Sequence, residues 1–497
     1  LPHYAFQAAA LRAGDWPLWN PYLLTGHPEL AGAQWGVAYP PQVVGLSLFG
    51  AQAYIKVTLV AHAVLGLVVA RWLIRAWLRA QGLAERPGTV LFLAPTLALS
   101  GFWAGHVYAG HIQFAQALPW LMATAAAGLD VCAGRPRAGV VLALGLGFAV
   151  LAGGPQLAPF GLAGALPLWL LALRHAANPR RAAVALLGGL ALGVAVAAVQ
   201  ILPAVELTAA SARARLPMAQ FAQGYLWQWA YLPSLWVPDW PRLAGAKDAW
   251  EYDVWVGGPA LALAFVGLAL PRARGLVAAL FGATLALLAL AGPLGAALQT
   301  VVPGVDLLRV PARMALGATW LLPLAAATTL AVADAAALRR WGAGLCGLAG
   351  LSILAFGASA WPIWAVAGLT LAMAWALWRA AVAQPGGWLA AALVAPSALI
   401  VAAPGWTTRD DPLAAPIVLA GQSTLLADPH ARTVWLASKR WNTGMAMGVR
   451  QLGAYEPFAN WRTASLQKAL TSGTATGPWP RMFAVWPGRN AAWSPLW

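Results

Sequence analysis

The chain has 497 residues, of which 61% are hydrophobic and only 9% are charged, and its mean hydropathy is +0.67. Soluble domains carry roughly 25% charged residues, so this composition excludes a soluble protein and predicts one that crosses a membrane several times. The net charge is +16, yet the basic residues fall in short loops between apolar runs. That placement is typical of cytoplasmic membrane loops and argues against nucleic acid as a partner.

The N-terminal segment is polar and aromatic at once. We expect a short helix over residues 2–13, and then a loop, because the prolines within residues 10–41 exclude a continuous helix. The tryptophans and tyrosines of residues 10–41 are typical of a membrane–water boundary. This stretch is therefore predicted to be a folded extracytoplasmic loop forming the floor of a site at the membrane surface. Because residue 1 already lies in loop sequence, we expect a further span upstream.

The apolar runs that follow predict about twelve membrane spans, or thirteen with the expected upstream span. Arginine-containing loops alternate with arginine-poor loops, which places the N-terminal loop and every second loop outside the cytoplasm. Residues 42–50 are apolar but too short to span. We therefore expect an all-α polytopic bundle over 52–404, preceded by an outer loop at 1–51 and containing a long outer loop at 204–255. The expected spans are 52–74, 89–104, 114–129, 139–153, 157–173, 182–203, 256–271, 275–297, 314–338, 342–358, 362–379 and 387–404.

The composition changes near residue 405. Charged residues become frequent, and alternating segments such as ARTVWLAS predict strands. Residues 405–497 are thus expected to form a small β-rich extracytoplasmic domain that is truncated at its end. The two cysteines, Cys132 and Cys346, give no disulfide framework, and no zinc or nucleotide motif is present. The cofactor is therefore unknown, with a divalent cation left open.

Candidate functional groups concentrate in the predicted outer loops. Asp15 and Glu29 lie in the first loop, although long loops also hold carboxylates simply because they are solvated. Arg309 and Arg313 flank a proline at a span entrance, on the side that the positive-inside bias disfavours. Their guanidinium groups suit a phosphate, and the alternative is anchoring to anionic lipid headgroups.

Two further residues have a structural and a functional interpretation each. His111 stands at the mouth of a predicted span, where it is either a satisfied interfacial residue or a substrate contact. Glu206 lies where a span leaves the membrane, and it either forms an ion pair with Arg213 or Arg215 or contacts substrate.

Several motifs resemble one family. The run Gly14-Asp15-x-Pro17-x-Trp19-Asn20-Pro21-Tyr22, followed by Gly26-x-Pro28, resembles the first outer loop of YfhO-like bacterial membrane proteins, members of the GT-C superfamily of polytopic glycosyltransferases. The run Leu308-Arg309-Val310-Pro311-Ala312-Arg313 is a second strong match. Weaker matches are Gly110-His111 with Pro119-Trp120, and Leu202-Pro203-x-x-Glu206.

The resemblance implies a GT-C-like enzyme of the bacterial inner membrane with its active face extracytoplasmic. Such an enzyme moves a sugar from a polyprenyl-phosphate-linked donor to a cell-envelope glycan acceptor, with membrane lipids around it. Its catalytic acid lies in the first outer loop, which implies a catalytic role for Asp15 or Glu29. The implied substrate-binding residues are Trp19, Asn20, His111, Glu206, Arg309 and Arg313, with no metal ligand among them.

Two other functions remain as alternatives. A lipid-linked glycan flippase or transporter would place polar groups at mid-span, where this sequence has few charges. A non-catalytic scaffold of an envelope complex would use the tryptophan-rich loops to bind a protein partner.

Overall fold

A computed structural model describes residues 2–23, 26–86, 88–135, 137–211, 225–237, 239–301, 310–334, 432–433 and 450–451. The described part is mainly helical, as predicted. The last three predicted spans lie outside it, and so does the predicted 405–497 domain except for two short strands. These strands, β3 (Arg432–Thr433) and β4 (Arg450–Gln451), pair in parallel.

The N-terminal helix and loop are present as expected. Helix α1 (Pro2–Arg12) is followed by a loop in which β1 (Trp19–Asn20) and β2 (His27–Pro28) pair antiparallel, with Asn20 opposite His27. The remaining helices of the described part are α2 (Pro40–Ala80), α3 (Thr89–Ala98), α4 (Gly101–Tyr108), α5 (Ile112–Cys132), α6 (Ala138–Leu151), α7 (Leu157–Leu173), α8 (Pro179–Val196), α9 (Ala198–Ala209), α11 (Trp240–Leu243), α12 (Gly258–Ala269), α13 (Arg274–Ala291), α14 (Pro293–Val301) and α15 (Ala318–Val332). Three 3₁₀ segments complete the series: η2 (Trp229–Leu235), η3 (Ala249–Glu251) and η5 (Pro311–Gly317).

Five helical stretches of the described residues are long and apolar enough to cross a membrane, and shorter apolar helices accompany them. The chain is therefore a multi-pass membrane protein. The predicted total of about twelve spans stays a prediction. The five stretches are Pro40–Ala80, Thr89–Tyr108, Pro179–Val196, Arg274–Ala291 and Pro311–Val332.

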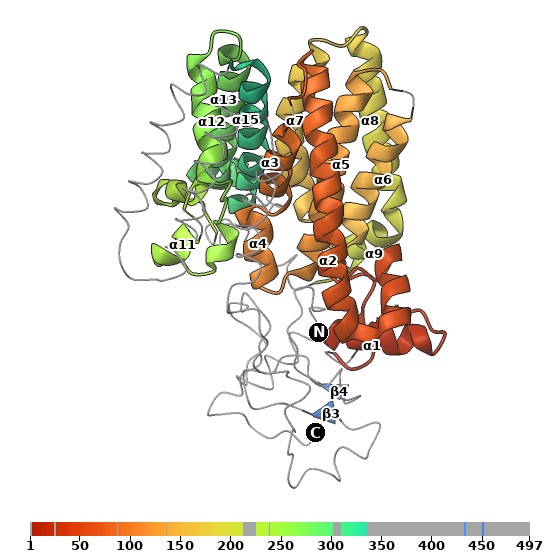
Figure 1. The fold of residues 1–497 in the computed structure, drawn as a ribbon. Coiled ribbons are helices and arrows are strands. Elements are labelled where there is room, and N and C mark those ends of the chain that lie inside the picture. The colour runs from red at the N-terminus through yellow and green to blue at the C-terminus, as the bar shows by residue number, and fades with distance from the viewer. Residues whose placement is uncertain are drawn as a thin grey trace.

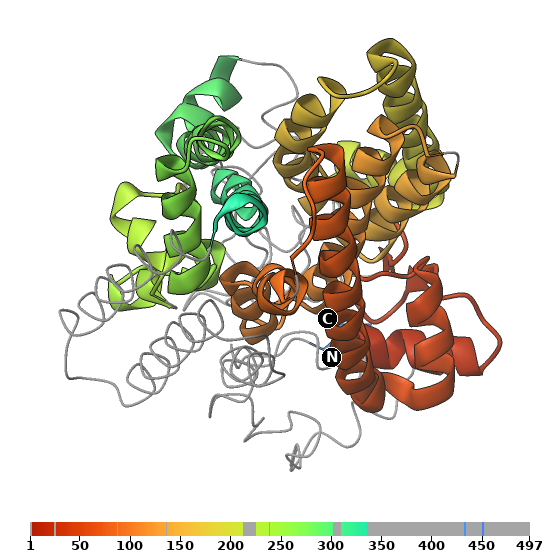
Figure 2. The same cartoon turned by 45° about the horizontal axis from the view of Figure 1, so that its top comes forward.

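The helices form two groups that stand side by side. One contains α2, α5, α6, α7 and α8, the other contains α12, α13 and α15, and α3 and α4 lie between them (Figures 1 and 2). One apolar core runs through both groups, with Trp77 of α2 and Trp320 of α15 fully buried. Small residues permit the closest approach: a Cβ on Gly164 of α7 would lie 3.1 Å from the Cα of Gly317.

Several predicted boundaries differ from the structure, and the predicted span 275–297, for example, is divided at Gly292 into α13 and α14. The segment 42–50 belongs to α2, which continues through a kink at Gly50 (φ 73°, ψ 173°), a conformation that favours glycine. The predicted span 182–203 is two helices, α8 and α9. The predicted span 89–104 is also two helices, because the Gly101 N–H donates to the carbonyl of Trp255 instead of continuing α3. This partner is distant in sequence, so apolar run length gives no indication of the break.

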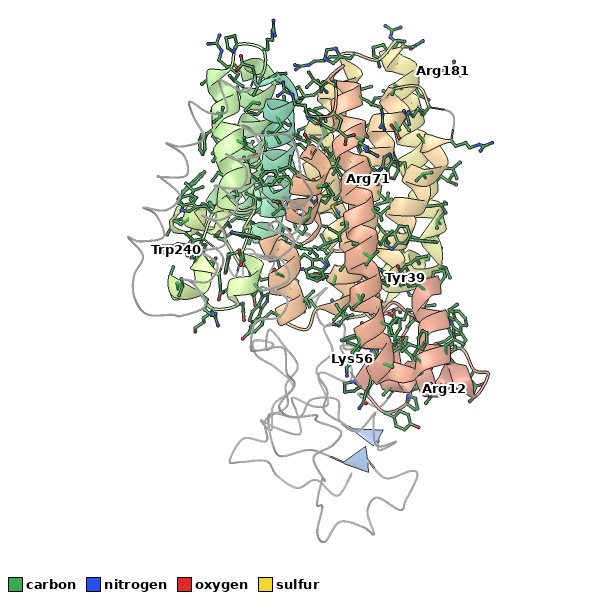
Figure 3. All side chains as sticks on the ribbon, viewed as in Figure 1. Arg12, Tyr39, Lys56, Arg71, Arg181 and Trp240 are labelled. Carbon is green, nitrogen blue, oxygen red and sulfur yellow. The ribbon has the colours of Figure 1, made fainter. Side chains whose placement is uncertain are left out.

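The two ends of the bundle differ in charge. At one end Arg75 pairs with Glu85, and both Arg79 and Arg135 pair with Asp130. Arg181 lies at this end and Arg12 and Lys56 at the opposite end (Figure 3). We call the first the arginine-rich end and the second the loop end, since the first loop is there. The positive-inside rule predicts that the arginine-rich end is cytoplasmic.

Candidate functional site

The first loop is organised around the carboxylate of Glu29, which is fully buried. The carboxylate accepts hydrogen bonds from His3 Nδ1 at 2.8 Å, Asn20 Nδ2 at 3.0 Å and Gln7 Nε2 at 3.3 Å. The His3 ring stacks on Trp35 with 3.7 Å between ring centroids. Glu29 thus ties the loop to α1 at two points, His3 and Gln7, and to β1 at Asn20.

The electrostatics of Glu29 follow from these partners. Burial alone would raise its pKa, but His3 and the hydrogen bond from Asn20 outweigh burial and hold the pKa below its usual value. Glu29 is therefore an ionised, fully bonded carboxylate with no exposed surface. Its geometry is that of an anchor for the loop.

The other predicted residues of this loop lie differently. Asp15 is exposed just after α1, and Trp19 is 57% exposed on β1. Asn20 is buried, and its side chain both donates to Glu29 and accepts from the Tyr22 N–H. The described part of the loop therefore presents the carboxylate of Asp15 and the indoles of Trp16 and Trp19 above a buried polar base.

A second group of polar side chains, which we call the histidine–arginine cluster, consists of His106, His111, Gln156, Glu251 and Arg313. The Arg313 guanidinium holds both carboxylate oxygens of Glu251, with Nε–Oε2 at 2.8 Å and Nη2–Oε1 at 2.7 Å. Its Nη1 donates to Gln156 Oε1 at 2.9 Å. The side chains of Arg313 and Glu251 are 7% and 5% exposed, so the ion pair is buried.

The two histidines complete the histidine–arginine cluster. His106 Nδ1 and His111 Nδ1 lie 3.0 Å apart, so one ring donates a hydrogen bond to the other. His106 Nε2 is buried without a hydrogen-bond partner in the described part of the chain, and it lies 3.8 Å from Glu251 Oε2. Phe114 packs against both His106 and Arg313, whose Cζ lies 4.7 Å from the ring centroid.

The pKa values of Glu251 and His111 in this cluster are shifted from their usual values. Burial would raise the pKa of Glu251, but Arg313 and the nearby histidines outweigh burial and lower it to about 2. Burial lowers the pKa of His111, with Arg313 acting in the same direction against Glu251. At neutral pH the histidine–arginine cluster therefore combines an ion pair with a neutral His111.

A divalent cation is chemically compatible with this cluster. One ligand atom from each of His106, His111 and Glu251 lies within 4.8 Å of the others. Two imidazole nitrogens and a carboxylate suit zinc or a similar transition metal. Because Arg313 already occupies both oxygens of Glu251, a bound ion would compete with that guanidinium.

One turn connects the two polar groups. Gln156 follows the turn at Gly153 and Gly154, and a Cβ on Gly153 would overlap the backbone of Gln34 in the first loop. The Gln200 amide donates to the Ala33 carbonyl of the same loop and to the Val150 carbonyl of α6. The loop thus packs on the α6–α7 turn that also supports Arg313.

The structure brings together only some of the predicted site residues. His111 and Arg313 meet in the histidine–arginine cluster, whereas Glu29 and Asn20 meet in the first loop. Glu206 is exposed on α9, and Arg309 and the expected partners Arg213 and Arg215 lie outside the described residues. The prediction did not include Glu251, Gln156 or His106 in the site. Glu251 is one of several acids in a long loop, and no sequence pattern pairs it with Arg313.

The fold and these clusters define a helical, multi-pass membrane protein with two clusters of buried ionisable groups. Neither a protein-family model nor a curated protein matches the sequence. Two solved structures of ArnT from Cupriavidus metallidurans are similar to the chain. The apo structure has a TM-score of 0.47 and 14% identity over 95% of this chain and 86% of ArnT. The structure bound to undecaprenyl phosphate has a TM-score of 0.38 and 17% identity over 80% of this chain and 67% of ArnT. At these values the similarity assigns neither a family nor a substrate.

Proposed function

We propose that the chain is a membrane glycosyltransferase that moves a sugar from a polyprenyl-phosphate-linked donor to an acceptor at the loop end. The observation that carries the proposal is the histidine–arginine cluster, a buried guanidinium and two histidines supported by the turn on which the first loop packs. Transfer from a lipid phosphate needs a base for the acceptor hydroxyl and cationic donors for the departing phosphate. The first loop supplies carboxylates, and the histidine–arginine cluster supplies a cationic donor.

Exposure favours Asp15 over Glu29 as the general base. A base must reach the proton that it removes. The Glu29 carboxylate is buried, and its three hydrogen bonds come from α1 and from the first loop, so it does not reach an acceptor. Asp15 is exposed, and it lies beside Trp16 and near Trp19, whose indoles are 50% and 57% exposed. Exposed indoles of this kind suit stacking on a sugar ring.

Arg313 supports the phosphate end of the reaction. Its Nη1 bonds to a neutral amide, Gln156, and a phosphate oxygen is able to replace that amide without separating Arg313 from Glu251. The neutral His111 adds a hydrogen-bond donor without a full charge. Arg309, four residues before Arg313, belongs to the same proposal.

The proposed reaction is a direct displacement. The acceptor oxygen attacks the anomeric carbon while the carboxylate removes the hydroxyl proton, and the carbon–oxygen bond to the phosphate breaks. The phosphate leaves with the electron pair, and its negative charge is stabilised by guanidinium groups. Inversion at the anomeric carbon follows from the GT-C resemblance. A cell-envelope acceptor and an extracytoplasmic active face in the bacterial inner membrane complete the proposal.

The test is a transfer assay on the purified protein in liposomes containing undecaprenyl-phosphate-linked glucose, with a cell-envelope glycan added as acceptor and release of undecaprenyl phosphate as the measurement. We expect release from the wild type and a loss of at least about 100-fold in Asp15→Asn, the usual size of a general-base contribution. Glu85→Gln, which removes an exposed carboxylate at the arginine-rich end, serves as the control. Equal activity in Asp15→Asn and the control would contradict the assignment of the base.

A lipid-linked glycan transporter is the second candidate, and one observation favours it. A chain of hydrogen bonds, which we call the α2–α5 polar network, lies between these helices. Trp120 donates to the Tyr39 hydroxyl, Tyr39 contacts His62 Nε2 at 2.7 Å, and His62 Nδ1 contacts the Thr58 carbonyl at 2.8 Å. Gln116 donates to Tyr54 and Thr58, while its own Oε1 is buried without a partner in the described residues. Polar groups inside a bundle are a feature of transport pathways.

The same liposomes separate the candidates. Movement of the labelled lipid between leaflets without release of undecaprenyl phosphate would favour the transporter. If the lipid neither moved nor reacted, the scaffold alternative would be favoured.

A further inference from the structure

A cavity of about 270 Å³ lies at the arginine-rich end, and none of its lining residues belongs to the proposed transfer site. It is formed where α2, α7, α13 and α15 meet, at the junction of the two helix groups. Its polar lining consists of Gln81, Arg174, His175, Arg272, Gly275 and Thr328, and leucines of α7 and α13 form an apolar wall.

The cavity has an excess of positive charge. Arg174 and Arg272 come from different helix groups, and both are exposed. The nearby acids Glu85 and Asp130 are engaged by Arg75, Arg79 and Arg135, and within the described residues no carboxylate pairs with either cavity arginine. Two guanidinium groups that face one cavity repel each other unless an anion lies between them.

Two neutral donors face the same space. The Gln81 Nε2 is buried and has no hydrogen-bond partner in the described part of the chain. Burying an amide donor without a partner is unfavourable, so a rotation of the Gln81 side chain that brings Nε2 to the cavity surface would gain it an acceptor. Helix α13 begins at Arg274, whose N–H donates to the Leu270 carbonyl, and the Val277 N–H donates to the Ala273 carbonyl, so the first-turn donors that remain are the N–H groups of Gly275 and Leu276. Gly275, in this first turn, lines the cavity, and a Cβ on it would meet no atom within 4 Å.

We propose that this cavity binds a phosphate group held by Arg174 and Arg272, with the Gln81 amide and the first turn of α13 as neutral donors. Two planar guanidinium groups and backbone N–H donors match the several oxygens of a phosphate. Free phosphate and the headgroup of an anionic phospholipid share this chemistry. The apolar wall of leucines accommodates the glycerol of a lipid, and basic pockets between helices on the cytoplasmic side are typical headgroup sites.

The experiment measures binding to the full protein purified in detergent. Phosphatidylglycerol, neutral phosphatidylcholine and inorganic phosphate are titrated separately, and the bound species are counted by native mass spectrometry together with the shift in unfolding temperature. The test variant is Arg174→Gln with Arg272→Gln. The control is Arg180→Gln with Arg181→Gln, which removes the same charge from exposed positions at the same end, outside the cavity lining (Figure 3).

We expect the cavity variant to bind phosphatidylglycerol about 10- to 30-fold more weakly, while the control changes it less than about threefold. Phosphatidylglycerol binding alone identifies a lipid site, and binding of inorganic phosphate alone identifies a site for a soluble anion. Equal binding by the wild type and the cavity variant, or an equal loss in the control, would overturn the proposal.

A second variant separates binding from folding. Gly275→Asp introduces a carboxylate into open space at the first turn of α13, where a negative charge is favourable to the helix. We expect it to keep the unfolding temperature of the ligand-free protein and to lose phosphate binding. Retained binding in Gly275→Asp would count against the site as decisively as retained binding in the arginine variant.

Discussion

The buried ion pair of the histidine–arginine cluster gives the sharpest prediction about stability. Arg313→Met keeps the length of the side chain and removes three hydrogen bonds, two of them to Glu251. The Glu251 carboxylate is then left buried without its guanidinium. His106 does not replace the lost hydrogen bonds, because its Nε2 lies 3.8 Å from Glu251 Oε2. Breaking a buried pair in this way costs about 3–5 kcal/mol of unfolding free energy.

A double-mutant cycle tests the origin of that loss. Glu251→Gln alone leaves the Arg313 guanidinium buried without a carboxylate, and it is expected to lower the unfolding free energy by a similar amount. The double variant, Arg313→Met with Glu251→Gln, removes both charges. The double variant should therefore lose clearly less than the sum of the single losses, with a coupling of about 2–3 kcal/mol. The measurement is equilibrium unfolding in mixed micelles, followed by tryptophan fluorescence.

The pair of Arg79 and Asp130 provides the matched control. Its Nη2–Oδ1 distance is 3.1 Å, and the arginine side chain is 40% exposed. Solvent screens such a pair, so Arg79→Met is expected to cost at most about 1 kcal/mol. Additive losses at Arg313 and Glu251, or a loss at Arg79 as large as that at Arg313, would refute the reasoning from burial.

Three further predictions concern protonation and packing. Because the folded-state pKa of Glu29 is lowered, its contribution to stability is present above its usual pKa and disappears as the pH falls through the folded value. In pH-dependent unfolding, Glu29→Gln should therefore lose less unfolding free energy at acid pH than the wild type does. Burial raises the pKa of Asp253 to about 7, so its contribution is present below its usual pKa of 3.8 and is lost as the pH rises through about 7; an unchanged pH profile in Asp253→Asn would count against this. Gly101→Ala places a Cβ 2.5 Å from the Trp255 N–H, so it should lower the unfolding free energy by about 1–3 kcal/mol, whereas Gly139→Ala, whose Cβ meets no atom within 4 Å, should not lower it.

Features that depend on local sequence were predicted well. Residue spacing and charge predicted a short N-terminal helix, a proline-rich loop and arginine-rich turns at one end. The structure has α1, a loop over 13–39 and the arginine-rich end at the corresponding places. Some helices were also located correctly: the apolar run 157–173 matches α7 residue for residue.

Features that depend on distant partners were not predicted. Glu29 is one carboxylate among several in the sequence, and only the approach of His3 and Gln7 from α1 makes it a buried anchor. Arg313 was expected to face a phosphate or headgroups, yet its first partner is Glu251, 62 residues earlier. Pairings of this range leave no periodic pattern in a single sequence.

The α2–α5 polar network has a consequence for the order in which the protein assembles. In hydrocarbon, apolar packing alone leaves neighbouring helices free to slide, because leucine packs as favourably against lipid tails as against another helix. The bonds from Gln116 to Tyr54 and Thr58 select one register, and a shift by one turn would leave several polar atoms in lipid without partners.

The same bonds make α2 incomplete by itself. Until α5 enters the bilayer, the Tyr54 and Thr58 hydroxyls lack the Gln116 donor, and Tyr39 lacks the indole of Trp120. The two short helices α3 and α4 separate these partners in the chain, so α2 must wait while they are synthesised. Helices α2 to α5 therefore form a single unit of insertion, on which the later helices are then built.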